Sequence, residues 1–509
     1  MSVAAAWIWV VLAADPPLIF PPIESALVFR LTVAPAAVPA RKLQYELLPT
    51  RRDRTPGNAA VEYLRAGLQL PQRPRLDPEE TQRRDEMLDR WRTTPLPRFP
   101  AADVKRELRS YDRALRVADR AARMDHCDWQ YPPPSMKADL DTADLMAARE
   151  ISNWLRLRVK VELAEGRIED ARQTLQTAFQ MAKHVGDGHP LMRSIVGVAL
   201  AVYAHYMVAD FVSVPGGPNL YWALATLPDP FLDLRPVVLG ESDLLPNTFP
   251  GLVEFEKGPV SEARAWELIQ AMRKDLQMLT DAGAFFEEFR GRSDSGLDSV
   301  FGTILAFAFR DPPTEFESAV RRYADDFAAI ARADSGRKWL RSRGVKDTDK
   351  MPPLQAAYLA SWLRYRTRYD ELTASMLLPT PQAVAQTSLA AAATKVEAAQ
   401  ARNDPIARTL LTFAPAMEKT LAAHVRLRRQ LAALRAVEAL RAHLAVSGGQ
   451  FPKSWTEVTV VPVPDDPLTG KPFEYMLAYG KATITAPPPV GENPHKGNNF
   501  QYVLSVREP

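Results

Sequence analysis

Apolar residues recur at helical spacing over most of this chain. Between residues 57 and 446, apolar positions three, four and seven apart predict one amphipathic helix after another. Clusters of proline separate these helices, because proline lacks an amide N–H and restricts the residue before it. The pattern predicts a mainly α protein of irregular stacked helical hairpins.

The clearest hairpin is predicted between Thr142 and Val185. Gly166 supplies a tight turn between its two helices. Both helices carry apolar or small residues at helical spacing on one face: Leu155, Val159, Leu163, Ala171, Leu175 and Ala178. Two such faces bury each other best when the helices pack side by side.

The turn and second helix of this hairpin resemble a tetratricopeptide repeat. Gly166, Ala171, Leu175 and Ala178 stand where that family places its turn glycine, small alanine, large apolar residue and second alanine. The resemblance implies helical hairpins that stack and present a concave surface to a protein or peptide. No 34-residue recurrence accompanies it, so irregular stacking is favoured over a regular repeat array.

The pattern changes after a long helix predicted at 410–446, which Pro415 interrupts and Ser447-Gly448-Gly449 ends. Three β-rich runs then predict a small antiparallel sheet. They lie at 473–477, 482–485 and 500–506. A further strand-like alternation occurs far upstream, at Leu27 to Ala34, inside a Pro-rich segment.

This C-terminal module, about residues 430–509, resembles the globular end of type II secretion pseudopilins. The family pattern is a helix, a glycine, an aromatic-proline pair and an Asp-Pro-Gly loop that leads into a sheet. The residues that carry it here are Gly449, Phe451, Pro452, Pro464, Asp466, Pro467, Gly470, Pro472, Phe473 and Tyr475. The resemblance implies a shared small fold and not assembly into a pilus.

The layout also resembles a group of uncharacterised exported bacterial α-helical proteins. Three segments carry that resemblance, at Leu47–Ala60, Asn219–Pro228 and Asp466–Tyr475. No activity follows from it. Together the patterns divide the chain into 1–14 as a signal peptide, 15–56 as a Pro-rich segment, 57–290 as a helical-hairpin domain, 300–446 as a second helical region and 447–509 as the β module.

The first residues, Met1 to Ala14, form an apolar run of about 12 residues, the length of a signal-peptide core. Val11-Leu12-Ala13 offers a small-residue cleavage site, although no Lys or Arg precedes the apolar run. We therefore expect an exported protein of the periplasm or cell envelope. An uncleaved N-terminal anchor and a cytoplasmic protein are the alternatives, and any membrane contact is expected only through the N-terminus.

The net charge of +3 comes from 64 basic and 61 acidic residues that are interspersed, so no nucleic-acid-binding surface is indicated. Arg426, Arg428, Arg429 and Arg435 form the densest basic cluster, for which a solvated helix face is expected. One cysteine among 509 residues excludes an intramolecular disulfide. The 44 prolines serve mainly as helix punctuation, and the 23 glycines are too few for many phosphate-binding loops.

Common catalytic motifs are missing: no Walker loop, Gly-x-Ser-x-Gly elbow or His-Glu-x-x-His pair occurs. His184 and His189 are five residues apart and form at best a weak metal pair. The segment Asp125–Trp129 brings Cys127 next to His126, a pairing that can activate a thiolate. A half-buried helix terminus, with Cys127 and Trp129 packed and the aspartates in water, is the simpler interpretation.

No catalytic, cofactor-binding or metal-ligating residue is therefore assigned, and no cofactor is expected. We expect a non-catalytic exported helical scaffold that binds a protein or peptide, with no indicated oligomeric state. Two alternatives stay open: an accessory component of an envelope secretion or filament system, and a hydrolase with an unrecognised site near His126 and Cys127.

Overall fold

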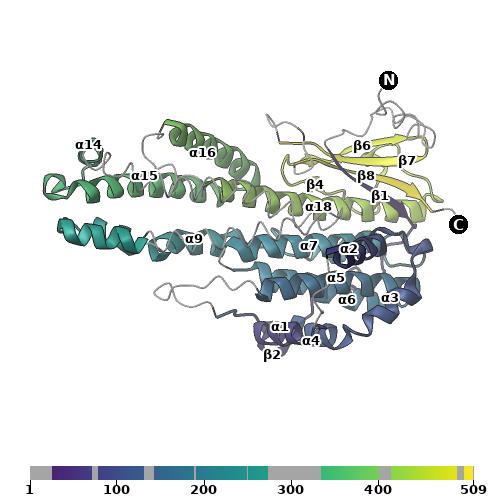
Figure 1. Cartoon of the computed structure of the whole chain (residues 1–509). Helices are drawn as coiled ribbons and strands as arrows, with labels where there is room; N and C mark the ends of the chain where they lie inside the picture. The colour runs from purple at the N-terminus through teal and green to yellow at the C-terminus, as the bar shows by residue number, and fades with distance from the viewer. Residues whose placement is uncertain are drawn as a thin grey trace, which may run out of the picture. The chain divides into compact units, whose positions relative to one another are not determined.

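The computed structural model is mainly helical with small sheets, which confirms the predicted class (Figure 1). It describes residues 26–71, 78–130, 143–188, 191–248, 250–272, 334–400, 414–489, 494 and 498–507. The predicted signal peptide, His189 and the predicted boundary at 290–300 lie outside these residues. Two compact units interleave along the sequence: one comes from 1–46, 207–227 and 428–509, the other from 47–206 and 228–427.

The first unit contains a four-stranded sheet of order β1-β8-β7-β6. Its strands are β1 (Leu27–Val33), β6 (Glu474–Ala478), β7 (Lys481–Ala486) and β8 (Phe500–Val506). The last three pair antiparallel, as predicted. β1 adds a parallel edge, with Leu27 opposite Phe500 and Phe29 stacked on Tyr502 at 4.8 Å. The strand-like alternation near residue 27 thus belongs to the C-terminal sheet.

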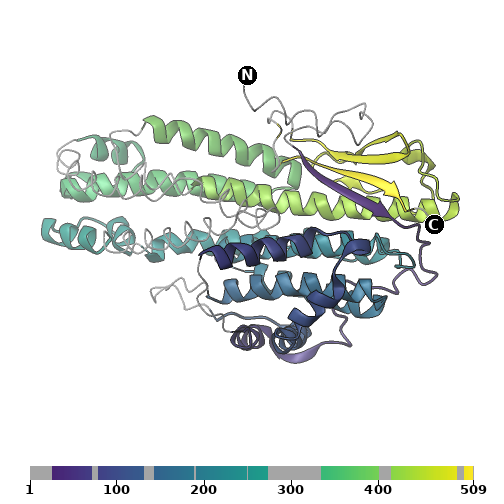
Figure 2. The same ribbon diagram turned by 45° about the vertical axis from the view of Figure 1, so that its right-hand side comes forward.

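The helix that enters this sheet is α18 (Ala414–Val446), whose residues from Arg428 onward belong to the first unit. Figure 2 shows the sheet lying along this part of α18. Gly448 and Gly449 end the helix with positive φ angles of 69° and 84°. Short elements complete the unit: the end of α7 (Leu191–Phe211), α8 (Tyr221–Ala225), a 3₁₀ turn (Trp455–Glu457), β4 (Asp465–Asp466) and β5 (Lys471–Pro472).

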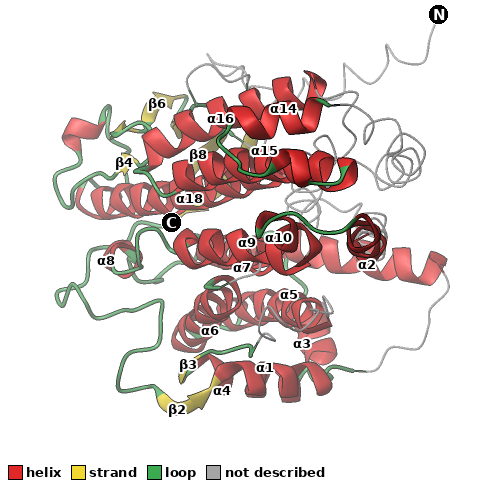
Figure 3. Ribbon diagram, turned by 90° about the vertical axis from the view of Figure 1, so that its left-hand side faces the viewer, coloured by secondary structure: helices red, strands yellow, loops and turns green. Residues whose placement is uncertain are grey.

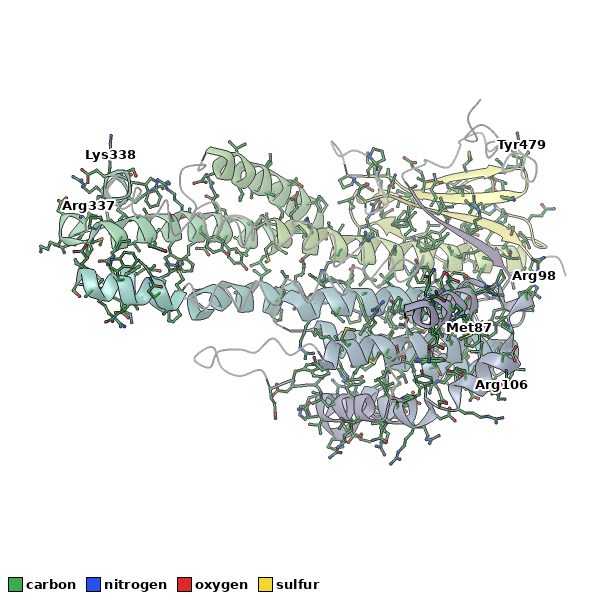
Figure 4. All side chains as sticks on the ribbon, in the orientation of Figure 1. Met87, Arg98, Arg106, Arg337, Lys338 and Tyr479 are labelled. Carbon is green, nitrogen blue, oxygen red and sulfur yellow. The ribbon has the colours of Figure 1, made fainter. Side chains whose placement is uncertain are left out.

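Buried charge ties loops of the first unit to α18. Arg441 and Glu438 pair at 2.8 Å with both side chains fully buried. The Arg441 guanidinium also donates to the carbonyl oxygens of Ala34 and Gly217, at 2.8 and 3.0 Å. Arg441 therefore provides hydrogen-bond donors to backbone carbonyl oxygens that lie away from water. Exposed Tyr479 occupies the β6–β7 turn, at the end of the sheet where β1 and β8 finish (Figure 4).

The second unit begins with a small β pair and a set of packed helices. A parallel pair, β2 (Thr55–Asn58) and β3 (Met124–His126), lies beside α1. The helices are α1 (Ala59–Leu68), α2 (Pro78–Thr93), α3 (Ala101–Leu108), α4 (Asp112–Ala122), α5 (Ala143–Ala164), α6 (Ile168–Gly186) and the first part of α7 (Leu191–Phe211), with a 3₁₀ turn at Leu96–Arg98. In Figure 3, α1 and α4 lie below α5 and α6.

The predicted hairpin is confirmed as α5 and α6, which pack against each other. Gly166 takes φ +71° in the turn, a conformation that favours glycine. Ala171, Leu175 and Ala178 are fully buried. The chain then reverses again into α7, where Gly197 meets Gly186 of α6 so closely that a Cβ at 197 would lie 2.2 Å from the Gly186 Cα atom.

The remaining helices of this unit gather around α15 (Pro353–Met376), which carries a row of buried aromatic residues. Trp362 and Tyr365 of α15 are buried, and the Trp362 indole donates to Glu256 at 2.5 Å, so these rings have a packing role. The elements are α9 (Leu234–Thr248), α10 (Pro250–Glu256), helical residues 262–272, α14 (Ser335–Ser342), a 3₁₀ turn (Thr348–Lys350), α15 (Pro353–Met376), α16 (Thr380–Gln400) and the start of α18. Among the described helices, Arg193–Phe211 is long and apolar enough to cross a membrane, but 89% of its apolar window is buried, as in a core helix.

Candidate functional site

The segment Asp125–Trp129 follows α4 instead of ending it. The helix stops at Ala122, and Met124–His126 form β3, so the predicted helix terminus is wrong in this respect. The burial prediction is confirmed: Cys127 and Trp129 are half-buried and both aspartates are exposed. Asn58 holds the segment, because its side chain caps α1 at Ala60 and also bonds the Asp128 backbone at 2.6 and 2.8 Å.

The carboxylate and imidazole of this segment pair with each other in solvent. Asp125 Oδ1 lies 2.9 Å from His126 Nδ1 and accepts from the Gly57 amide at 3.1 Å. These bonds lower the pKa of Asp125, the bond to His126 most strongly. Both side chains are exposed, so water competes for every contact that a substrate would make with them.

Cys127 is in an environment that disfavours a thiolate. Burial raises the pKa of its thiol to about 12, against a smaller opposing effect of Arg193. A reactive cysteine needs a pKa near or below neutral pH, because the thiolate is the nucleophile. The arrangement therefore does not favour a Cys127 hydrolase.

His184 is enclosed by side chains from three segments. Its Nδ1 lies 3.2 Å from the Tyr63 hydroxyl and its Nε2 lies 2.7 Å from the Gln180 amide, while Trp129 donates to its backbone oxygen at 2.9 Å. Burial lowers the pKa of His184 to about 3. With both ring nitrogens occupied, His184 serves as a packing group, and the described residues include no group of three or more metal-ligating side chains.

A serine and a histidine meet in the second unit without any sequence signal. Ser194 of α7 lies 2.9 Å from His424 Nε2, and His424 Nδ1 lies 2.9 Å from the Thr420 carbonyl oxygen. Since a carbonyl only accepts, Nδ1 carries the proton and Nε2 accepts from the serine. A serine that donates to a histidine nitrogen is the arrangement of a nucleophile and its general base. Ser194, however, is fully buried and out of a substrate's reach. Two residues 230 positions apart could not be paired by any local motif.

Charge is concentrated between α4, α5 and α6 as well. Arg158 makes a two-point ion pair with Asp119 at 2.7 and 2.9 Å and donates to Thr174 at 3.0 Å. Thr174 in turn donates to Glu162 at 2.8 Å. Burial raises the pKa of Glu162 to about 7, in spite of the nearby Arg158. These groups satisfy one another and hold three helices together.

None of the four arginines expected on a solvated helix face is exposed: Arg429 is buried, and Arg426, Arg428 and Arg435 are half-buried. Arg429 is 2% exposed and makes a two-point ion pair with Asp466, the shortest contact being 2.7 Å. It also donates to the carbonyl oxygens of Asn498 and Pro487 at 2.9 and 2.6 Å. The solvated-face prediction is therefore wrong, and Arg429 instead anchors the Asp-Pro-Gly loop on α18.

An accessible surface with directional chemistry lies on α1 and α4, and we call it the α1–α4 face. Aliphatic residues at helical spacing are exposed on α1: Val61, Leu64 and Leu68. Arginines at the same spacing are exposed on α4: Arg113, Arg116 and Arg120. The two helices pack against each other (Figure 3). Arg120 of the basic row pairs with Glu62 of α1 at 3.0 Å, which brings the basic row beside α1.

No protein-family model matches the chain, and neither a curated protein nor a solved structure is similar to it. The chemistry of the described residues therefore carries the functional assignment.

Proposed function

We propose that this protein is a non-catalytic, exported helical scaffold that binds another protein. The observation that carries the proposal is the α1–α4 face. Leu64 and Leu68 are 50% and 82% exposed on one side of α1. A row of exposed aliphatic side chains beside a row of cations is typical of an interaction surface.

The half-buried cysteine and three wholly or partly buried histidines support a non-catalytic role. The pKa of Cys127 is raised to about 12, and those of His184, His205 and His424 are lowered by burial to about 3 or 4. A general base that works near neutral pH needs a pKa near that pH and access to substrate. These histidines have neither.

We propose tetratricopeptide-like but irregular stacking for the first helices of the second unit. α1 packs on α4, α4 packs on α6, and α6 packs on α5, so two helical pairs lie in contact. Stacking of this kind leaves the outer helices with a free side for a partner.

Photo-crosslinking tests the proposed function. A benzoylphenylalanine residue at Leu64 should form discrete protein adducts in the native host, because the side chain projects from the α1–α4 face. The same residue at Leu389, which is 65% exposed on α16, is the matched control. Adducts at neither position, or equally at both, would contradict a protein-binding role for this face.

Export is proposed from the apolar segment Met1–Ala14 and the resemblance to exported bacterial proteins. Mass spectrometry of the N-terminus from fractionated cells tests it. A mature chain beginning near residue 14 in the envelope fraction supports export, whereas an intact Met1 in the cytoplasmic fraction contradicts it.

A second proposal is an accessory role in an envelope secretion or filament system. Its support is the C-terminal module: α18 leads into an antiparallel sheet, and the Asp-Pro-Gly loop is fixed to that helix by Arg429 and Asp466. β1 belongs to the same sheet, so co-purification with envelope proteins should use the full chain and not the C-terminal segment alone. Recovery of no envelope protein would count against this role.

A further inference from the structure

The aliphatic row of the α1–α4 face is an unpartnered side of an otherwise well-packed helix. Val61, Leu64 and Leu68 are 42%, 50% and 82% exposed, at positions i, i+3 and i+7. The opposite side of α1 is buried through Tyr63 and Ala66. Helical spacing places the three aliphatic side chains in one line along about two turns.

The basic row runs beside it on α4. Arg113, Arg116 and Arg120 are exposed at positions i, i+3 and i+7, while Ala114 and Leu115 are buried on the other side. Among the residues that the structure describes, neither Arg113 nor Arg116 has an ion pair or a side-chain hydrogen bond. Their charge is available to a partner.

Glu62 fixes the relative position of the two rows. Its carboxylate is buried and pairs with Arg65 of α1 and, at 3.0 Å, with Arg120 of α4. Arg65 therefore lies on the edge of α1 that faces α4. Across the face, the order is aliphatic row, Arg65, Glu62, then the arginines of α4.

We propose that the α1–α4 face binds an amphipathic α-helix that carries an apolar stripe and, beside it, an acidic stripe. The apolar stripe packs on Leu64 and Leu68, and the acidic stripe pairs with Arg113 and Arg116. Apolar anchors at i, i+3 and i+7 are the contacts by which helices recognise each other. This inference rests on the proposed scaffold function and specifies the chemistry of its partner.

The division of the rows between two helices favours a protein helix over a lipid surface. Interfacial membrane helices combine cations and a broad apolar face, commonly with Trp or Phe, on one helix. Here the apolar row is three short aliphatic residues, and the unpaired cations lie on the neighbouring helix. Two adjacent stripes match the two adjacent faces of one docked helix.

Two synthetic 18-residue peptides test the proposal with the purified full chain. Both carry Leu at helical spacing; the neighbouring stripe is Glu in one peptide and Lys in the other. We expect the Glu peptide to bind about tenfold more tightly by fluorescence anisotropy, because two or three exposed charge pairs distinguish the peptides. The preference should shrink at high salt.

Variants locate the binding on the two rows. The double variant Leu64→Ser with Leu68→Ser should lower the affinity for the Glu peptide by about tenfold or more. The double variant Arg113→Glu with Arg116→Glu should reverse the preference, so that the Lys peptide binds more tightly. The controls are Leu389→Ser on α16 and the pair Arg83→Glu with Arg90→Glu on α2, all at exposed positions. These should leave both affinities unchanged. Circular dichroism verifies that each variant is folded.

Equal binding of the two peptides, or binding that the row variants do not alter, would overturn the proposal. Binding of vesicles with 30% phosphatidylglycerol that is lost in the same variants would assign the face to a membrane instead. If crosslinks at Leu64 persist while the protein binds the Glu and Lys peptides equally, the scaffold function stands. Only the acidic stripe of the proposed partner helix is then rejected. If both fail, the scaffold function is rejected too.

Discussion

Buried ionic side chains hold this protein together at points where the chain pattern alone shows only charge. Asp465 and Asp466 are neighbours in one loop, yet Asp465 is exposed and Asp466 is 1% exposed against Arg429. Asp466 is the buried carboxylate because it pairs with Arg429 of α18, a helix that is distant in sequence. For this reason, local pattern predicted the loop but not the role of either carboxylate.

Asp466→Asn should destabilise the protein by about 3–5 kcal/mol, because it leaves the buried Arg429 guanidinium without its counter-charge. Asp465→Asn is the matched control at the adjacent, exposed position, with an expected change below about 0.5 kcal/mol. Urea unfolding measures both. Equal effects of the two substitutions would contradict the ion-pair assignment.

The buried histidine His424 should make stability fall in acid. Burial lowers its pKa to about 4 from an ordinary value of 6.5. Below pH 6.5 the unfolded chain binds a proton that the folded chain rejects, so this contribution is complete above pH 6.5 and is lost as the pH falls toward 4. Glu162, whose folded pKa is about 7, has the opposite effect in the same range.

His424→Gln isolates the histidine contribution. Between pH 6 and 4.5, the free energy of unfolding of the wild type should fall more steeply than that of the variant, by about 1.4 kcal/mol per pH unit. Urea unfolding at each pH gives the two slopes. Parallel slopes would show that His424 does not titrate differently in the folded protein.

At the scale of elements, the helices followed the pattern of apolar residues closely. α5 and α6 match the hairpin predicted between Thr142 and Val185, and α18 ends at Val446, where the predicted long helix ends. An amphipathic helix can be predicted in this way because its pattern involves residues only three or four apart. The antiparallel strands β6, β7 and β8 were predicted for the same reason. The pairing of β1 with β8 was not, since register between distant strands leaves no local signal.

The α6–α7 crossing depends on two glycines. Gly197→Ala would place a Cβ 2.2 Å from the Gly186 Cα and 2.8 Å from its amide nitrogen. Overpacking against backbone should cost about 3 kcal/mol, offset by about 1 kcal/mol of helix propensity. Gly188→Ala is the control, because no atom lies within 4 Å of its Cβ position. Thermal unfolding compares them, and similar midpoints would contradict close packing at residue 197.

At the scale of the molecule, compactness and sequence order do not coincide. The first unit draws on residues from both ends of the chain and on 207–227. The candidate face on α1 and α4, in contrast, is formed within one stretch of about 60 residues. Its amphipathic rows were therefore present in the sequence, but only helix packing shows that the two rows are neighbours.

The sheet should require both ends of the chain. A fragment that starts at Ala414 contains β6, β7 and β8 but lacks β1, so β8 loses the backbone partners Leu27–Val33 and the ring stacking of Phe29 on Tyr502. Hydrogen exchange at β8 should be at least about tenfold faster in the fragment than in the full chain. Addition of a 26–34 peptide should restore protection. Equal protection without it would show that β1 is dispensable.

The parallel pairing of β1 with β8 also means that the two partner strands are synthesised at very different times. Paired residues such as Thr32 and Ser505 are 473 positions apart. At about 5–20 residues per second, the first strand emerges from the ribosome roughly 25 to 95 s before its partner exists. During that interval the apolar sequence LVFRLTV is an open strand edge, able to pair with other chains. A nascent-chain binder that holds this segment would therefore act at the moment when the protein is most prone to aggregate.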